Sequence, residues 1–198
     1  MDNGRMLVLA SASPRRRELL TQAGYLFEVR PAEINEDPRA GEDPEAYVTR
    51  LAREKAQAVY VELCRGSEAN SNLVVLGADT TVTLDGAILG KPGSTEDAAR
   101  MLRLLSGRVH RVITGIAVVT DGKTQAVAEV TTVHFLPVTE DEIAAYIDTG
   151  EPMDKAGAYA IQGQAARWIP RIEGCYFNVV GLPIARVTAM LKPHIEKD

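Results

Sequence analysis

Two long strand-like runs joined by a single Asp-Gly pair limit the folds open to this chain. The stretch RVITGIAVVTDGKTQAVAEVTTVHF places Asp121 and Gly122 between segments rich in β-branched residues. Asp-Gly is favoured at the centre of a tight β-hairpin, because both central positions there need a positive φ. A second pair, Asp85 and Gly86, follows the apolar run NLVVLGADTTVTL. The chain is therefore expected to contain a sheet with two hairpins.

Apolar periodicity predicts further strands and helices around these hairpins. No repeat, low-complexity tract or linker rich in Pro, Gly and Ser divides the chain, so we expect one domain over 1–198. Strands and helices alternate irregularly, which favours a mixed α/β or α+β sheet protein. Further strands are expected at 6–10, 27–31 and 176–180, and an acidic loop at 32–43. Helices are expected at 14–23, at 44–63, at 95–106, after Thr139 and at 183–192. In the first of these helices, Leu19, Leu20 and Ala23 should face inward.

Composition narrows the class of protein. The chain has 198 residues, a net charge of −5 and two cysteines outside any CxxC spacing, which argues against a disulfide framework or a structural zinc site. The negative charge disfavours a nucleic-acid partner, and no apolar run is long enough to span a membrane. We expect a cytoplasmic protein with a small-molecule partner.

Three consecutive arginines stand where the first helix should begin. Ser13 and Pro14 are typical of an N-cap followed by the first helical residue, and Arg15, Arg16 and Arg17 come next. The first turn of a helix carries partial positive charge and usually holds acidic residues. A bound phosphate would offset this mismatch, because guanidinium and free N–H groups both favour an anion. The alternative is a solvated basic patch in which Arg17 pairs with nearby acids.

A lysine lies on the apolar face of the helix expected over 44–63. Val48 and Lys55 are one heptad apart and therefore share that face. A lysine there favours an anionic partner, although its ammonium could instead extend past the edge of the core. Lys91, in the GKPG loop, is a third candidate cation, with a solvated loop lysine as the alternative.

Asp79 is the strongest candidate for a reacting carboxylate. It interrupts a strand whose neighbours suit burial, and a buried carboxylate is costly unless it is paired or bound to metal. Glu36, in the loop EINEDP, is a second candidate acid, although any acid of this loop could simply be solvated. Two carboxylates with several cations suit a divalent metal, Mg²⁺ or Mn²⁺, and a polyphosphate. The set predicts metal-assisted phosphoryl chemistry.

Other chemistries lack support in the sequence. LGKPGST is not a Walker loop, since that pattern requires glycine at Asp85. No GxGxxG, GxSxG or HExxH motif occurs. The three histidines, His110, His134 and His194, are scattered, and we expect structural or exposed roles for them.

Several motifs, in order, resemble those of the Maf family, the septum-formation-associated nucleotide pyrophosphatases. They are ASASPRR, LAREKA, LGADTTV, LGKP, GEPMDKAGAYAIQG and NVVGLP, and the resemblance extends over about residues 7 to 192. It implies a mixed elongated sheet flanked by helices, similar to the inosine triphosphate pyrophosphatases, with two lobes around a cleft and no separable linker. It also implies a homodimer. One departure is GQAARWIPRIEGCYF, where the family commonly has two adjacent glycines.

The resemblance further implies an activity and a set of site residues. The family hydrolyses a nucleoside triphosphate between the α and β phosphates with a divalent metal, which yields a monophosphate and pyrophosphate. Asp79 matches the family's proton acceptor. Phosphate binding is implied for Ser13, Arg16, Lys55 and Lys91, and metal binding for Glu36 and Asp79.

Substrate choice is implied by three other positions. Arg15, Thr80 and Gln162 match the subgroup that resembles dTTP/UTP pyrophosphatases. Two alternatives remain open at this point: a non-catalytic nucleotide-binding regulator of cell division, and an enzyme directed at modified nucleotides for which UTP and dTTP are only convenient substrates.

Overall fold

The computed structural model describes residues 5–65 and 72–195. No helix within these ranges combines the length and apolarity required to cross a membrane. The strands are β1 Met6–Leu9, β2 Phe27–Val29, β3 Leu73–Leu84, β4 Ala87–Leu89, β5 Val109–Thr120, β6 Lys123–His134 and β7 Arg171–Glu173. The helices are α1 Pro14–Gln22, α2 Pro44–Cys64, α3 Thr95–Leu105, α4 Glu140–Asp148, α5 Tyr176–Val180 and α6 Ile184–Ile195, with 3₁₀ turns at Glu151–Asp154, Ala156–Ala158 and Gln164–Trp168.

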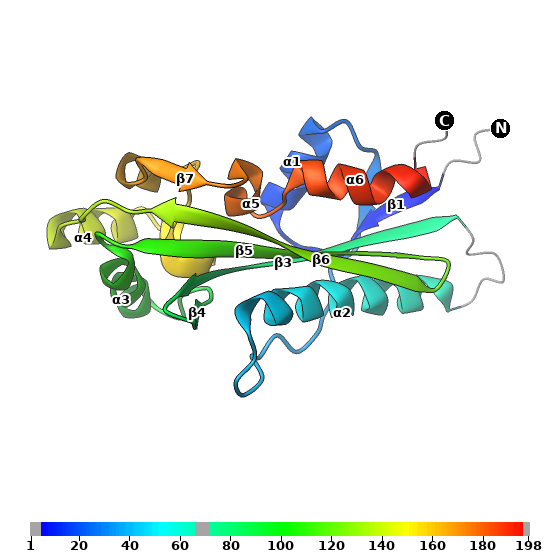
Figure 1. The fold of residues 1–198 in the computed structure, drawn as a ribbon, viewed down its shortest axis with the longest axis horizontal. Coiled ribbons are helices and arrows are strands. Elements are labelled where there is room, and N and C mark those ends of the chain that lie inside the picture. The colour runs from blue at the N-terminus through cyan, green and yellow to red at the C-terminus, as the bar shows by residue number, and fades with distance from the viewer. Residues whose placement is uncertain (1–4, 66–71, 196–198) are drawn as a thin grey trace. The chain divides into compact units, whose positions relative to one another are not determined.

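One mixed sheet runs through the described residues. Its strands follow the order β2-β1-β3-β5-β6-β7, and β4 pairs with β3 outside this path. β1 pairs in parallel with β2 and β3, whereas β4 and β7 pair antiparallel with β3 and β6. Figure 1 shows the three long strands β3, β5 and β6 with helices beside them. The mixed α/β class predicted from the sequence is confirmed.

Both Asp-Gly pairs form the expected hairpin turns. Asp85 and Gly86 have φ values of 51° and 83°, and Asp121 and Gly122 have values of 50° and 70°. Two successive positive φ angles match the right-handed twist of the flanking strands. These turns connect β3 to β4 and β5 to β6.

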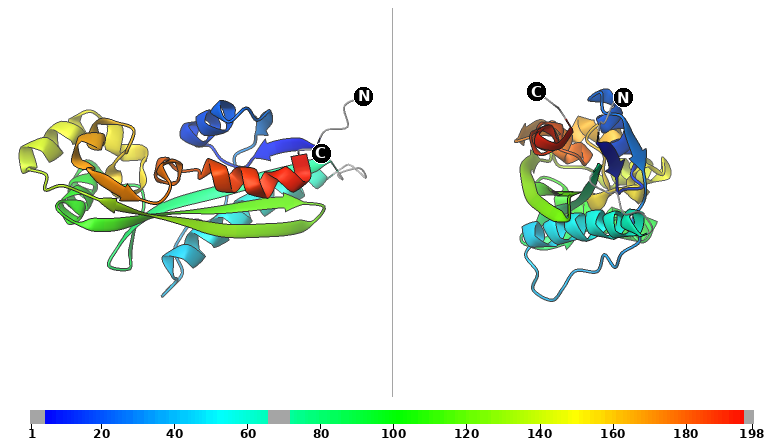
Figure 2. Two further views of the ribbon diagram at one scale, coloured as in Figure 1. Left: turned by 45° about the horizontal axis from the view of Figure 1, so that its top comes forward. Right: turned by 90° about the vertical axis from the view of Figure 1, so that its right-hand side faces the viewer.

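The chain divides into two compact units. The first comprises residues 1–79, 114–129 and 181–198. Within this unit, α2 covers one face of the sheet, while α1 and α6 cover the other (Figure 2). Gly77 of β3 and Gly115 of β5 let the backbone of α2 approach closely, because a Cβ at either position would overlap a carbonyl oxygen of that helix. Aliphatic side chains, most of them alanine or valine, fill the space between helix and sheet, namely Val8, Ala10, Ala52, Ala56, Val59, Leu73, Val75, Ala117 and Val119.

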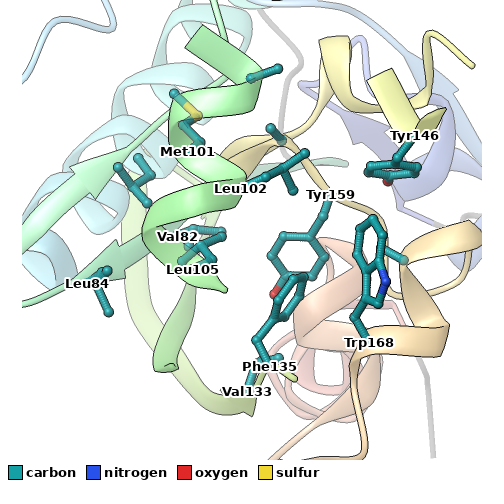
Figure 3. Packing of buried hydrophobic residues seen from close by; sticks show 14 of the residues in the cluster. Val82, Leu84, Met101, Leu102, Leu105, Val133, Phe135, Tyr146, Tyr159 and Trp168 are labelled. Atoms are coloured by element: carbon teal, nitrogen blue, oxygen red, sulfur yellow. The ribbon is translucent and has the colours of Figure 1, made fainter. Parts of the chain in front are cut away.

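The second unit comprises residues 80–113 and 130–180. Its core contains four aromatic side chains, shown in Figure 3, in which Phe135 contacts Tyr159 and Trp168, and Tyr146 contacts Trp168 edge to face. Helix α3 contributes an apolar face to the same core. Aromatic pairs of this kind stabilise a core beyond the area they bury.

Two local predictions are wrong. Residues 176–180 form the short helix α5 and not a strand. Asn178 of α5 is buried, and its amide donates to the carbonyl of Val112 and to Oγ1 of Thr131. These tertiary hydrogen bonds outweigh the strand preference of the adjacent valines. Ala23 is exposed, because α1 ends at Gln22 and Ala23 is its C-cap.

Candidate active site

Asp79 lies at the end of an apolar stretch of β3 in the first unit. Residues 73–78 are buried, and β1 pairs with this stretch in parallel. The Asp79 side chain is also buried, with 11% of its surface exposed. Its carboxylate therefore needs a partner within the fold.

Lys55 supplies that partner. It projects from the apolar face of α2, and 10% of its side chain is exposed. Its Nζ donates to Oδ1 of Asp79 at 2.7 Å and lies 2.8 Å from Oε1 of Glu36. One ammonium thus joins both predicted carboxylates. The expectation that Lys55 faces inward toward an anion is confirmed, and the alternative of a solvated ammonium is not.

Glu36 reaches this pair from the acidic loop that precedes α2. Its own side chain is 54% exposed, so the loop must hold it in position. The hydroxyl of Tyr47 donates to the Glu36 carbonyl oxygen at 2.9 Å. Burial, with the nearby negative charges of Asp79 and Glu36, raises the pKa of Tyr47 to about 12. Tyr47 is therefore a hydrogen-bond donor at neutral pH.

A salt bridge joins this loop to α2 at a second point. Arg50 of α2 binds Glu42 through two parallel hydrogen bonds, from Nε to Oε1 at 2.6 Å and from Nη2 to Oε2 at 2.7 Å. The same Nη2 donates to the carbonyl of Asp37 at 3.2 Å. The hydrogen bonds from Arg50 lower the pKa of Glu42 to about 2. Sequence reasoning missed Tyr47, Glu42 and Arg50; only the spacing of Arg50 and Glu54 on one helix face gave a signal.

Helix α1 begins as predicted, with Ser13 as its N-cap. Oγ of Ser13 accepts from the backbone N–H of Arg16, and no acidic residue occupies the first turn. Arg16 is buried, and its guanidinium donates to the carbonyls of Ala78 and Gly181 at 2.8 and 2.9 Å. Burial lowers the pKa of Arg16, and the negative charge of Asp79 opposes that shift.

The contacts of Arg16 thus attach the start of α1 to the residue before Asp79. This structural role was not predicted from the sequence. Arg15, the next predicted site residue on α1, is half-buried. Ser13, Arg16, Glu36, Lys55 and Asp79 all belong to the first unit.

Three predicted site residues belong to the second unit. Lys91 is exposed in the loop after β4, and Gln162 is exposed in a turn between two 3₁₀ helices. The loops of these two residues are linked, because the N–H of Gly157 donates to the carbonyl of Gly90 at 3.0 Å. Thr80, directly after Asp79 in β3, is half-buried.

Comparison with known proteins identifies the family of this chain. The family model described as Maf-like protein matches residues 6–194. The chain belongs to this family. It is 51% identical to the dTTP/UTP pyrophosphatase of Koribacter versatilis (strain Ellin345), covering 96% of this chain and 94% of the relative. The dTTP/UTP pyrophosphatases of Citrifermentans bemidjiense and Thermococcus onnurineus are 52% and 51% identical, covering 94% and 90% of this chain and 94% and 92% of their own lengths.

Membership of the Maf-like family confirms the resemblance drawn from the sequence motifs. The match includes ASASPRR at one end and NVVGLP at the other, so both units are included. The roles assigned to individual site residues stay predictions.

Proposed function

We propose that this Maf-like protein hydrolyses dTTP and UTP to the nucleoside monophosphate and pyrophosphate. The relatives that carry the name dTTP/UTP pyrophosphatase are about half identical to it over nearly the whole chain. The observation that carries the proposal is the buried Lys55 ammonium within hydrogen-bonding distance of Asp79 and Glu36. A buried carboxylate fixed in this way is suited to accept a proton from an attacking water.

In the proposed reaction, Asp79 orients a water molecule and accepts its proton as the water oxygen attacks the α-phosphorus. The bond from that phosphorus to the bridging oxygen breaks, and pyrophosphate leaves. Lys55 holds Asp79 in place, and two of its three N–H donors are directed at carboxylates, so one can reach a phosphate oxygen. Neutralising charge on the leaving group is the main task of cations in phosphoryl transfer.

The remaining predicted residues divide between phosphate and base. Ser13, Arg15 and Arg16, at the start of α1, together with Lys91, are assigned to the phosphates. Thr80, Gln162 and Arg15 are assigned to base selection. A glutamine amide offers one donor group and one acceptor, which matches the donor and acceptor edge of uracil or thymine.

The two carboxylates suit a divalent ion. Among the described residues there is no group of three or more His, Cys, Asp or Glu side chains that could enclose a metal. Glu36 and Asp79 nevertheless contact one ammonium, so they lie close together, and Mg²⁺ typically uses one or two carboxylates with substrate phosphates. Glu36 and Asp79 would hold Mg²⁺ or Mn²⁺, which would neutralise phosphate charge. Isothermal titration of Mn²⁺ against the wild type and Glu36→Gln, with and without UTP, tests this assignment.

A nucleotide panel tests the function. Canonical and modified nucleoside triphosphates are incubated with Mg²⁺ or Mn²⁺, and monophosphate, pyrophosphate and orthophosphate are measured separately. We expect pyrophosphate from UTP and dTTP. Orthophosphate would indicate cleavage of the terminal phosphate and overturn the bond assignment. Nucleotide binding without hydrolysis would favour a non-catalytic regulator of cell division, and faster hydrolysis of a modified nucleotide would change the assigned substrate.

The proposal includes a homodimer in the cytoplasm that acts on free nucleotides, without nucleic-acid or membrane partners. Light scattering coupled to size exclusion tests the dimer, since the chain has a mass of 21.4 kDa. Elution at the monomer mass would reject it.

A further inference from the structure

Gln162 is not the only residue of the motif GEPMDKAGAYAIQG with a place in the described part of the second unit. The second residue of the motif, Glu151, accepts a hydrogen bond from the hydroxyl of Tyr146 at 2.6 Å. The backbone N–H of Gln164 points at the same carboxylate, 3.2 Å from Oε1 and 3.3 Å from Oε2. Glu151 therefore joins a tyrosine of α4 to the residue just after the turn that carries Gln162.

Tyr146 completes the arrangement from the other end of the same turn. Its hydroxyl accepts the backbone N–H of Ala160 at 3.2 Å while it donates to Glu151. The turn is closed by the N–H of Gly163, which donates to the Ala160 carbonyl at 3.1 Å. Gln162 thus lies between two backbone groups, those of Ala160 and Gln164, that are held by one Tyr-Glu pair.

The Tyr146–Glu151 pair is attached to the aromatic core of the second unit. Tyr146 is fully buried, and the centroids of its ring and the Trp168 ring are 5.1 Å apart in an edge-to-face contact. Figure 3 shows the two side chains next to each other. Gly163 allows the carboxylate of Glu151 to lie against the turn, because a Cβ at this position would overlap Oε1. Tyr146 and its hydrogen bond from Ala160 are buried, whereas Glu151 is half-buried, so the tyrosine is the firmer of the two attachments.

Gln162 itself is weakly constrained by its secondary structure. Its side chain is exposed, and it lies in a turn without helix or strand hydrogen bonding. A recognition group needs a defined position, because a displacement of about 1 Å can cost on the order of 100-fold in rate. The buried Tyr146 and the carboxylate of Glu151 hold Gln162 in a defined position, because they bind the backbone on both sides of it.

We infer that Glu151 and Tyr146 are positioning residues for base selection, which hold the turn of Gln162 so that its amide discriminates uracil and thymine from other bases. The inference rests on the proposed function and extends it. It assigns a role to the GEP part of the motif without direct contact between Glu151 and the nucleotide.

The test measures kcat and KM for UTP, CTP and GTP in the wild type, Glu151→Gln and Tyr146→Phe. We expect the preference for UTP to fall about tenfold in both variants, mainly through the KM for UTP. Tyr146→Phe keeps the ring against Trp168, so it serves if Glu151→Gln does not fold. Glu140→Gln, an exposed acid of α4 paired with Arg103, is the matched control and should keep the wild-type preference.

A double-mutant cycle separates positioning from general stability. If Glu151 acts through Gln162, Glu151→Gln should leave nucleotide preference unchanged once Gln162→Ala is present. Further loss of preference in the double variant would overturn the inference, and so would single variants that keep the wild-type preference while pyrophosphate is still released. A wild-type protein that releases no pyrophosphate from any nucleotide would overturn the proposed function, and this inference with it.

Discussion

The Nζ of Lys55 lies 2.7 Å from Oδ1 of Asp79, with both side chains about nine-tenths buried. Removal of one member of a buried ion pair leaves an uncompensated charge, which typically costs about 3–5 kcal/mol. We therefore expect Lys55→Met to lower the free energy of unfolding by about 3 kcal/mol, as measured by urea denaturation. Arg53→Met, an exposed position on the same helix, should change it little.

The double variant Lys55→Met, Asp79→Asn provides the complementary result. With both charges removed, much of the lost stability should return, while hydrolysis stays absent. A single Lys55→Met variant as stable as the wild type would show that water reaches Asp79 and that the pair does not support the fold.

Replacement of Asp79 by asparagine tests the base. Asparagine keeps the shape of the side chain but cannot accept the proton of the attacking water. We expect kcat to fall by roughly 1,000-fold or more with the fold intact, as judged by pyrophosphate release and circular dichroism. The exposed Asp37→Asn in the neighbouring loop is the matched control. Turnover retained in Asp79→Asn would reject this residue as the base.

The Glu42–Arg50 salt bridge should make stability depend on pH in acid. Its hydrogen bonds lower the pKa of Glu42 from 4.5 to about 2. A carboxylate with a depressed pKa stabilises the fold above its unfolded-state pKa and loses that contribution as pH falls through the folded value. The midpoint of unfolding should therefore decrease between about pH 4.5 and pH 2, and less steeply in Glu42→Gln. If the unfolding midpoint fell equally steeply with pH in the wild type and in Glu42→Gln, this prediction would be contradicted.

Patterns local in sequence predicted much of this site. The heptad spacing from Val48 placed Lys55 on the buried face, and the apolar context of Asp79 predicted its burial. Ser13 was recognised as an N-cap because capping depends on a few neighbouring residues. Each of these features follows from one strand or one helix.

Features that depend on tertiary contacts were not predicted. Glu151 and Tyr146 are close to each other in sequence, but nothing in the motif indicates that both would bind the turn of Gln162. The helical form of residues 176–180 depends on Asn178 bonding to two distant strands. Propensity scales contain no information about such partners.

The stability of the fold should also depend on pH through His110. Burial, with a smaller contribution from the charge of His134, lowers the pKa of His110 from 6.5 to about 4. Its Nε2 lies 2.8 Å from the Tyr159 hydroxyl. The unfolded chain binds a proton at a higher pH than the folded one, so stability should fall from about pH 6.5 to about pH 4, by about 3 kcal/mol at most.

His110→Gln should reduce this decline, since glutamine does not titrate. Chemical denaturation at pH 4, 5, 6 and 7 measures the difference from the wild type. His134→Gln, at a partly exposed position, should leave most of the decline in place. Identical pH profiles for the wild type and His110→Gln would show that the pKa of His110 is the same in the folded and unfolded states.

Gly77 fixes the distance between the strand of Asp79 and the helix of Lys55. A Cβ on Gly77 would overlap the Ala52 carbonyl oxygen and lie 2.9 Å from Cβ of Ala56, so α2 would have to move away from β3. We expect Gly77→Ala to lower the free energy of unfolding by about 3 kcal/mol and to reduce pyrophosphate release, because the shift separates Lys55 from Asp79. Gly93→Ala, where a Cβ meets nothing within 4 Å, should change neither. A stable, fully active Gly77→Ala variant would show that α2 can shift without disturbing the pair of charges.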